Sequence, residues 1–288
     1  MRVKYLCSAI SLIVVFLLTG QLTLAQNSRA ASAISYRQRG DDWMRAENLD
    51  RAIEDYSLAL IFDPNNVDAC QNRGVARFAK GDITGSIEEY TRALKLNPKF
   101  APAFYNRGVA RKAAGDVEGA ITDFDQALKL NPGMVEAYNN RATARKDKGD
   151  ISGALADLNL TIKLNPRLAE AYNNRGNCHL AEQRYPEAIS DYSQATRLNP
   201  RYATAYLNRG TARKNLGDFD QAVADYNQAI VLDANSVEAY LQRGLALMLL
   251  GRESKALPDF DRCLELAPES KPILEQRINQ IRSRLDRP

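Results

Sequence analysis

A glycine recurs along this chain at a constant interval of 34 residues, and this interval restricts the possible folds more than any other feature. A fixed period of that size indicates an array of structural repeats that stack to bury a shared core. The recurring residues are Gly40, Gly74, Gly108, Gly176, Gly210 and Gly244, with Ala142 in the one remaining place. Placing them at repeat position 8 gives seven repeats without insertions: 33–66, 67–100, 101–134, 135–168, 169–202, 203–236 and 237–270.

Each repeat predicts two helices, because apolar residues recur at the three- and four-residue spacing of an amphipathic helix. A Gly-Asp pair at positions 15–16 ends the first helix, since glycine readily adopts the left-handed conformation of a helix C-terminus. An Asn-Pro pair ends the second helix, because proline cannot continue the hydrogen-bonding ladder. The Gly-Asp pairs are 81–82, 115–116, 149–150 and 217–218, and the Asn-Pro pairs are 97–98, 131–132, 165–166 and 199–200.

Further columns identify the type of repeat. Position 4 is aromatic in six repeats, position 20 is alanine or serine, position 24 is aromatic or leucine, and position 32 is proline in six repeats. This pattern resembles the tetratricopeptide repeat (TPR) family over residues 33–270. The resemblance implies an all-α fold, an α-solenoid wound as a right-handed superhelix of seven helix-turn-helix repeats. It also implies a non-catalytic scaffold that binds other proteins. The chain departs from the family pattern with arginine at position 7 and, in four repeats, at position 11.

The glycine column is explained by packing. On a helical wheel, positions 4, 8 and 11 point within about 40° of one direction, as do positions 20, 24 and 27 of the second helix. Position 8 therefore faces the partner helix, and the missing Cβ allows close approach. We expect Gly176→Val to unfold its repeat.

Arginine occupies position 7 of every repeat and an acid occupies position 23. Both positions flank the core face of their helices, so we predict a ladder of arginine–acid pairs within or between repeats. A phosphate- or nucleic-acid-binding stripe is disfavoured, because the acids equal the arginines in number. The arginines are Arg39, Arg73, Arg107, Arg141, Arg175, Arg209 and Arg243, and the acids are Asp55, Glu89, Asp123, Asp157, Asp191, Asp225 and Asp259.

The candidate binding site is a row of side-chain amides at position 6, which points about 200° away from position 8. In TPR superhelices this face of the first helix lines the concave groove, and some long arrays carry asparagines there that grip the backbone of an extended peptide. An amide offers one acceptor and two donors, which suits any peptide unit. A neutral groove wall copied by repeat duplication explains the row equally well. The amide row comprises Gln38, Asn72, Asn106, Asn140, Asn174, Asn208 and Gln242.

Other groove positions narrow the choice of partner. The clamp by which some family members bind two carboxylates at chaperone C-termini requires basic residues where this chain has Asn173, Glu238 and Gln242, so we predict no such clamp. Near its C-terminal end the groove becomes apolar, and either a partner helix or the chain's own tail must cover it. Residues 271–288 favour the tail, as a capping helix with a stripe of Ile273, Leu274, Ile278, Ile281 and Leu285.

The N-terminus predicts export. Arg2 and Lys4 precede a short apolar stretch, and Thr23-Leu24-Ala25 offers small residues before a cleavage point, as in a secretory signal peptide over residues 1–25. Residues 26–32 are expected to be a short polar linker. We therefore expect a Sec-type leader and a periplasmic or extracellular protein. If the leader is retained, the chain is instead a membrane-tethered assembly factor or complex subunit facing the periplasm.

Charge, cysteines and motifs argue against other functions. The formal net charge of +4 falls to +2 without Arg2 and Lys4, which gives no nucleic-acid footprint. Cys70, Cys178 and Cys263 lie in distant repeats and are expected to be small core residues without a disulfide. The only histidine, His179, occupies a packing column. No enzyme motif, metal-ligand cluster or cofactor loop is present in the sequence. The expected partner is a protein or an extended peptide, and a membrane only if the leader remains.

Overall fold

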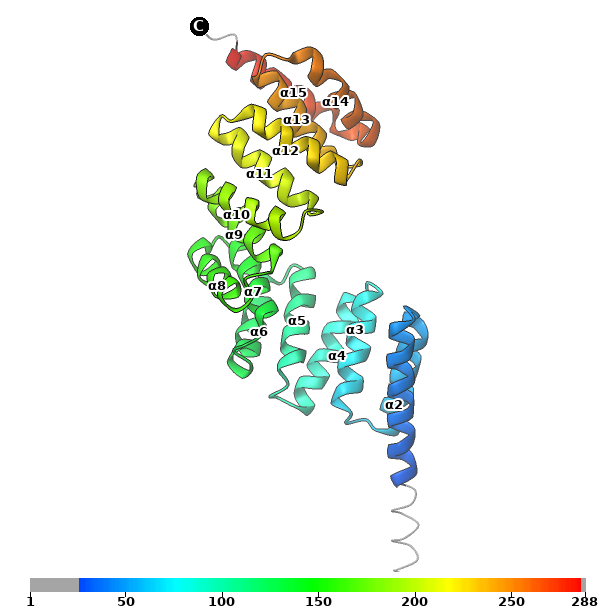
Figure 1. Cartoon of the computed structure of the whole chain (residues 1–288). Helices are drawn as coiled ribbons and strands as arrows, with labels where there is room; N and C mark the ends of the chain where they lie inside the picture. The colour runs from blue at the N-terminus through cyan, green and yellow to red at the C-terminus, as the bar shows by residue number, and fades with distance from the viewer. Residues whose placement is uncertain (1–25, 286–288) are drawn as a thin grey trace, which may run out of the picture. The chain divides into compact units, whose positions relative to one another are not determined.

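The structure, a computed structural model, describes residues 26–285 and consists there of helices without strands (Figure 1). The predicted leader over 1–25 and the last three residues lie outside the described residues. The first described helix covers residues 26–45. It is followed by α2 (Leu49–Phe62), α3 (Val67–Ala79), α4 (Ile83–Leu96), α5 (Ala101–Ala113), α6 (Val117–Leu130), α7 (Val135–Asp147), α8 (Ile151–Leu164), α9 (Ala169–Ala181), α10 (Tyr185–Leu198), α11 (Ala203–Leu216), α12 (Phe219–Leu232), α13 (Val237–Leu249), α14 (Glu253–Leu266), a 3₁₀ turn (Pro268–Ser270) and α15 (Lys271–Leu285).

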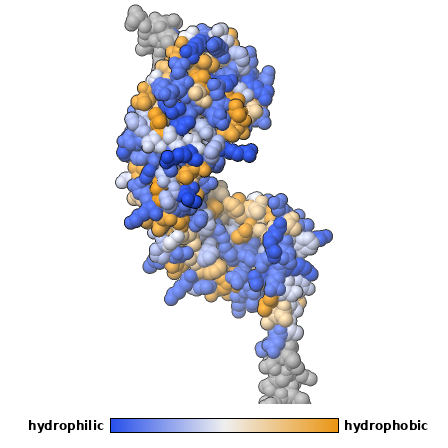
Figure 2. Space-filling model, viewed as in Figure 1, coloured by the Kyte–Doolittle hydropathy of each residue, from blue (hydrophilic) through white to orange (hydrophobic). Residues whose placement is uncertain are grey.

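These helices form the predicted antiparallel pairs, one pair in each repeat, and the fold is an all-α solenoid. The chain divides into two compact units, a first unit ending at Ala137 and a second unit beginning at Tyr138, which are described separately below. In the first unit α3 packs on α4 and α5 on α6, and in the second unit α9 packs on α10, α11 on α12 and α13 on α14. Hydrophilic residues cover most of the visible face (Figure 2).

The expected linker at 26–32 is wrong, because these residues are helical and continuous with the first helix of the first repeat. The segment lacks glycine and proline and is rich in alanine, the strongest helix former. Ser32 Oγ donates to the carbonyl of Ser28 at 3.0 Å, a bond across one helical turn. Within residues 26–285 no helix combines the length and hydropathy needed to cross a membrane.

The turn between the two helices of a repeat has the predicted form. Gly149 has φ of +91°, and the glycines at position 15 in four other repeats are also left-handed. In the remaining two repeats this place is taken by Glu47 and Gln183, with φ of 57° and 60°. Asp150 at the following position accepts a hydrogen bond from the backbone N–H of Gly153 and so caps the second helix.

The recurring glycine is required by an aromatic ring on the partner helix. A Cβ added at Gly176 would lie 2.7 Å from the ring of Tyr192, and one at Gly108 would lie 2.8 Å from Phe124. The fourth repeat shows the converse, because Ala142 at position 8 occurs with Leu158, the one non-aromatic residue at position 24. Glycine therefore recurs every 34 residues because, in six of the seven repeats, an aromatic ring occupies the space that a Cβ would need.

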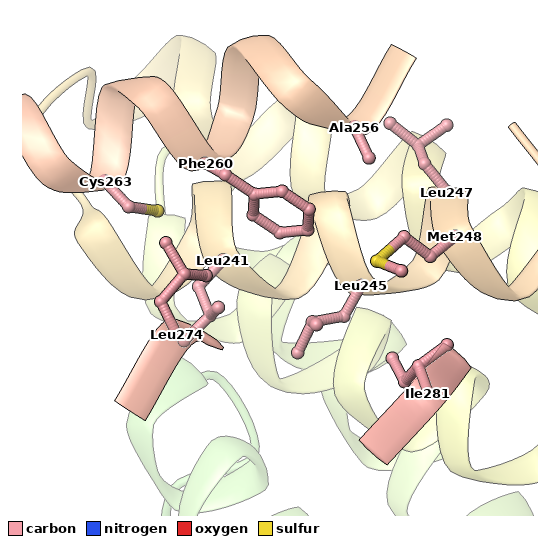
Figure 3. Close-up of a cluster of buried hydrophobic side chains, with 9 residues drawn as sticks. All are labelled: Leu241, Leu245, Leu247, Met248, Ala256, Phe260, Cys263, Leu274 and Ile281. Atoms are coloured by element: carbon pink, nitrogen blue, oxygen red, sulfur yellow. The ribbon is translucent and has the colours of Figure 1, made fainter. Parts of the chain in front are cut away.

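The C-terminal end of the solenoid is covered by α15, which contacts α13. Leu274 and Ile281 of α15 join Leu241, Leu245 and Met248 of α13 in one buried cluster (Figure 3). The apolar end of the groove is thus covered by the chain's own tail. The predicted stripe is wrong in one member, because the side chain of Ile273 is 56% exposed.

Within each unit the first helices of neighbouring repeats lie closer together than the second helices. α3 contacts α5 in the first unit, and α11 contacts both α9 and α13 in the second. No pair of successive second helices in the described residues has a comparable contact. The first helices therefore form the inner face of each unit, where the sequence places the amide row.

Candidate functional site

The amide row follows the first helices, as predicted, but its seven members differ in accessibility. Gln38 is exposed and Gln242 is buried, with 7% of its surface exposed. The five asparagines between them are all half-buried, namely Asn72, Asn106, Asn140, Asn174 and Asn208. The row is therefore partly accessible along its five asparagines and interior at Gln242.

In the second unit Asn174 and Asn208 bind the first helix of the preceding repeat. Asn174 Nδ2 donates to Asn139 Oδ1 at 3.0 Å. Asn208 Nδ2 donates to Asn173 Oδ1 at 3.0 Å and to Asn177 Oδ1 at 3.1 Å. The Oδ1 atoms of Asn174 and Asn208 accept no bond within the described residues, so each amide keeps an acceptor for another molecule.

In the first unit Asn72 repeats this arrangement with a charged partner. Its Nδ2 donates to Asp41 Oδ1 at 2.8 Å, and Tyr56 donates its hydroxyl to the same oxygen at 2.7 Å. The second unit has the same node, since Tyr192 donates to Asn177 Oδ1 at 2.8 Å. The side-chain oxygen of Asp41 or Asn177, at position 9, thus accepts hydrogen bonds from a core tyrosine of its own repeat and from a row asparagine of the next repeat.

Three other members of the row differ from these asparagines. Asn106 makes no side-chain hydrogen bond within the described residues, and neither does Gln38. Gln242 accepts from the ammonium group of Lys214, and its Nε2 donates to Glu238 Oε1 at 2.6 Å. Burial lowers the pKa of Lys214 from its ordinary value. Gln242 is therefore an internal hydrogen-bonding residue rather than an accessible amide of the row.

The predicted arginine–acid ladder is present in all seven repeats, and every pair lies within one repeat. In the third repeat Arg107 Nε and Nη2 donate to the two oxygens of Asp123 at 2.9 and 2.7 Å. The carboxylates are buried, from 1% exposed for Asp123 to 6% for Glu89. Such paired, charge-assisted bonds hold the two helices of a repeat in a fixed geometry.

The remaining guanidinium nitrogen extends this bonding to the preceding repeat. Arg107 Nη1 donates to Thr91 Oγ1 at 3.1 Å, and Arg209 Nη1 donates to Ser193 Oγ at 3.2 Å. In six repeats the guanidinium also lies over the position-4 ring, as Arg209 does over Tyr206 at 5.3 Å. The second repeat, with Cys70 at position 4, has no such ring.

A second donor reaches several of the buried acids from position 11. Arg111, Arg145 and Arg213 each bind the acid of their own repeat at 2.8 to 2.9 Å. His179 occupies this place in the fifth repeat, with Nε2 3.6 Å from Asp191. Burial lowers the pKa of His179 from its ordinary value of 6.5, against the opposing effect of Asp191. His179 is thus an inter-helix residue, as the sequence indicated.

The three described cysteines are free and buried in separate clusters, and burial raises their pKa values. Residues 26–285 contain no group of three or more potential metal ligands. The polar groups described above are side-chain amides and ion pairs.

Comparison with known proteins supports the assignment of the repeats. Family profiles described as "Tetratricopeptide repeat" match residues 101–134, 169–202 and 237–270, and one described as "TPR repeat" matches 74–115 and 210–251. Together they cover more than half of the 288 residues. The chain belongs to the TPR family. No curated protein sequence matches it.

Solved TPR structures resemble the chain over most of its length. A TPR protein from Parabacteroides merdae has a TM-score of 0.69 at 19% identity, covering 87% of this chain and 99% of that one. A thermophilic TPR protein of Thermus thermophilus has a TM-score of 0.53 at 28% identity, covering 63% of this chain and 98% of its own. YrrB, described as a TPR protein with an unusual peptide-binding site, has a TM-score of 0.53 at 21% identity, covering 64% and 95%.

Membership of the TPR family identifies the chain as a protein-interaction scaffold. TPR proteins bind proteins or peptides and are generally non-catalytic. In this TPR protein the arginines at position 7 bind an acid of their own repeat, and five of them are seen to bind a polar residue of the preceding repeat as well.

Proposed function

We propose that this TPR protein binds an extended segment of a partner protein along the row asparagines on the inner face of a unit, outside the cytoplasm. The observation that carries the proposal is the unused bonding capacity of Asn174 and Asn208. Each donates an N–H to the preceding repeat, and its carbonyl oxygen has no partner within residues 26–285. An extended peptide presents alternating N–H and C=O groups that such amides can bind whatever its side chains.

The repeat-to-repeat bonds of the row also support binding. Because Asn208 is held by Asn173 and Asn177, its side chain is already ordered before a partner arrives. Binding then costs less side-chain entropy than it would with free amides. The unusual peptide-binding site for which YrrB is described is consistent with peptide binding by a related fold.

The proposed location rests on the leader-like N-terminus. Arg2, Lys4 and the small residues before position 26 are typical of an export signal that is removed. N-terminal sequencing of the protein purified from the cell envelope tests this. A first residue at 26 agrees with the proposal, whereas retention of residues 1–25 would favour the membrane-tethered assembly factor.

Binding is tested by replacing Asn106, Asn174 and Asn208 together with alanine and measuring capture of envelope proteins by crosslinking and mass spectrometry. We expect capture of specific partners to fall more than tenfold. The matched control is Asn235→Ala, which removes an exposed amide away from the row. Unchanged capture by the triple variant would reject the proposal.

The bonding role of these amides requires a second control. Asn139→Ala removes the acceptor that holds Asn174 but leaves the row itself intact. If loss of capture follows from a looser solenoid, Asn139→Ala will reproduce it. If the amides contact the partner, Asn139→Ala will retain most of the capture while Asn106→Ala, which breaks no side-chain bond, will lower it.

A further inference from the structure

A small cavity opens between the first helices of the first and second repeats, within the first unit. Its volume is about 280 Å³, and it is lined by Asp41, Met44, Arg45, Tyr56, Asn72 and Val75. This volume lies just below the usual range of small-molecule sites, about 300–1,000 Å³, and suits one long side chain. It includes Asn72 and therefore lies beside the amide row on the inner face of the first unit.

Two side chains that line the cavity, Asp41 and Asn72, have oxygen atoms that can accept further hydrogen bonds. Asp41 Oδ1 already accepts from Tyr56 and Asn72, and Asp41 Oδ2 accepts from Arg37 Nη1 at 3.0 Å. Burial raises the pKa of Tyr56 far above its ordinary value, and the bond to Asp41 raises it further, so this hydroxyl stays a donor. The remaining capacity lies on Asp41 Oδ2 and on the Asn72 carbonyl oxygen, both of which require a donor from outside.

The walls and charges select the kind of donor. Met44, Val75 and the Tyr56 ring are apolar and suit a chain of methylene groups. The nearby cations are already paired, Arg37 with Asp41 and Arg45 with Asp42. Because Arg37 occupies one side of the carboxylate, a second guanidinium cannot form the two parallel bonds that it favours, whereas a compact ammonium needs only one site.

We propose that this cavity receives a lysine side chain of the bound segment, with its stem against Met44 and Val75 and its ammonium group on Asp41 and Asn72. The proposal rests on the proposed function, because the same inner face must hold the backbone. It adds a preference for one side chain, whereas the amide row is proposed to bind only the backbone of the segment. The equivalent node of the second unit has the neutral Asn177 in place of Asp41, so the preference belongs to the first two repeats.

The test uses nonapeptide pools whose central residue is lysine, arginine, norleucine, glutamate or alanine, with the other positions mixed from Ala, Ser, Thr, Gln and Val. The purified full chain is immobilised, and the retained peptides are quantified by mass spectrometry. We expect the lysine pool to be retained about fivefold better than the norleucine pool, as for one accessible ion pair. The preference should weaken as salt is raised.

Three variants give distinguishable outcomes. Asp41→Asn keeps the bonds from Tyr56 and Asn72 and should abolish the lysine preference, while Arg37→Gln frees the carboxylate and should increase it. Asp68→Asn removes an acid from the same face outside the cavity and should change nothing. Circular dichroism confirms that each variant is folded.

Each contrary result has one meaning. Equal retention of the lysine and norleucine pools, or of the lysine and arginine pools, would overturn the lysine assignment while leaving backbone binding intact. An Asp68→Asn variant that matches Asp41→Asn would also overturn it. If no pool is retained better than on the Asn106, Asn174 and Asn208 triple alanine variant, the proposed function itself fails and the assignment fails with it.

Discussion

Removing the ladder arginine should cost more in the seventh repeat than in the sixth. In the sixth repeat the buried carboxylate of Asp225 binds Arg209 at 2.7 Å and Arg213 at 2.8 Å. In the seventh repeat Asp259 binds Arg243, and position 11 is Leu247, which donates nothing. Both acids are about equally buried, at 3% exposure. The two repeats therefore compare the same deletion with and without a second cation.

The expected magnitudes follow from what each deletion leaves behind. Arg209→Ala leaves Asp225 with Arg213, so the loss is that of charge-assisted hydrogen bonds, about 1.5–3 kcal/mol. Arg243→Ala leaves Asp259 buried without a cation, which costs about 3–5 kcal/mol. Adding Asp259→Asn to Arg243→Ala removes the unpaired charge and should recover at least about 1 kcal/mol. Arg262→Ala, at an exposed ion pair with Glu265, should cost less than about 0.5 kcal/mol.

The assay must resolve single repeats, because repeat arrays unfold by segments rather than in one step. Native-state hydrogen exchange of α11 and α12 reports the sixth repeat, and exchange of α13 and α14 reports the seventh. Equal losses of protection in the two arginine variants would refute the argument that the second cation matters. A double variant no more stable than Arg243→Ala would refute the argument that an uncompensated carboxylate is the cause.

Three further predictions concern packing, protonation and backbone strain. Gly176→Ala should lower the free energy of unfolding by about 1–3 kcal/mol, because the added methyl group clashes with the Tyr192 ring. In urea unfolding, the double variant with Tyr192→Leu should lose less stability than the sum of the two single variants, because Ala142 and Leu158 already form such a pair. His179→Arg should stabilise the fifth repeat by about 1 kcal/mol, since a permanent cation would bind Asp191. The folded-state pKa of His179 is lowered, so the unfolded chain binds more protons and the native protein should lose stability as pH falls below about 6.5, a loss that His179→Arg should reduce. Gln183→Gly should raise the melting temperature by relieving up to about 1 kcal/mol of strain at φ of 60°, and Gly149→Gln should lower it similarly.

The contacts between the two helices of one repeat could be predicted from the sequence. The contact of Gly176 with the second helix and the pairing of Arg175 with Asp191 depend on a helical wheel and one short turn, both of which are local. The linker prediction for residues 26–32 is wrong because it gives their polar composition more weight than their lack of helix-breaking residues.

Contacts between repeats could not be predicted in the same way. The hydrogen bond between Asn208 and Asn173 depends on how the first helices of two neighbouring repeats are oriented relative to each other. A helical wheel of either helix alone gives no information on that orientation. The asparagines at position 5, Asn139 and Asn173, were a usable signal, since each lies one residue before a row member of its own repeat. Gln242 likewise binds Lys214 of the preceding repeat, a contact that its own repeat does not predict.

The polar contacts between repeats have a consequence for binding. In the second unit the junction between the fifth and sixth repeats is fixed by Arg209, which reaches Ser193 and Thr196 of the preceding second helix, and by Asn208, which reaches the preceding first helix. Hydrogen bonds are directional, so this junction specifies one rotation where apolar packing alone would tolerate several. The spacing between Asn174 and Asn208 is therefore set before a partner arrives. A segment bound along these asparagines, as proposed above, would meet side chains that are already ordered, which lowers the entropy cost of binding.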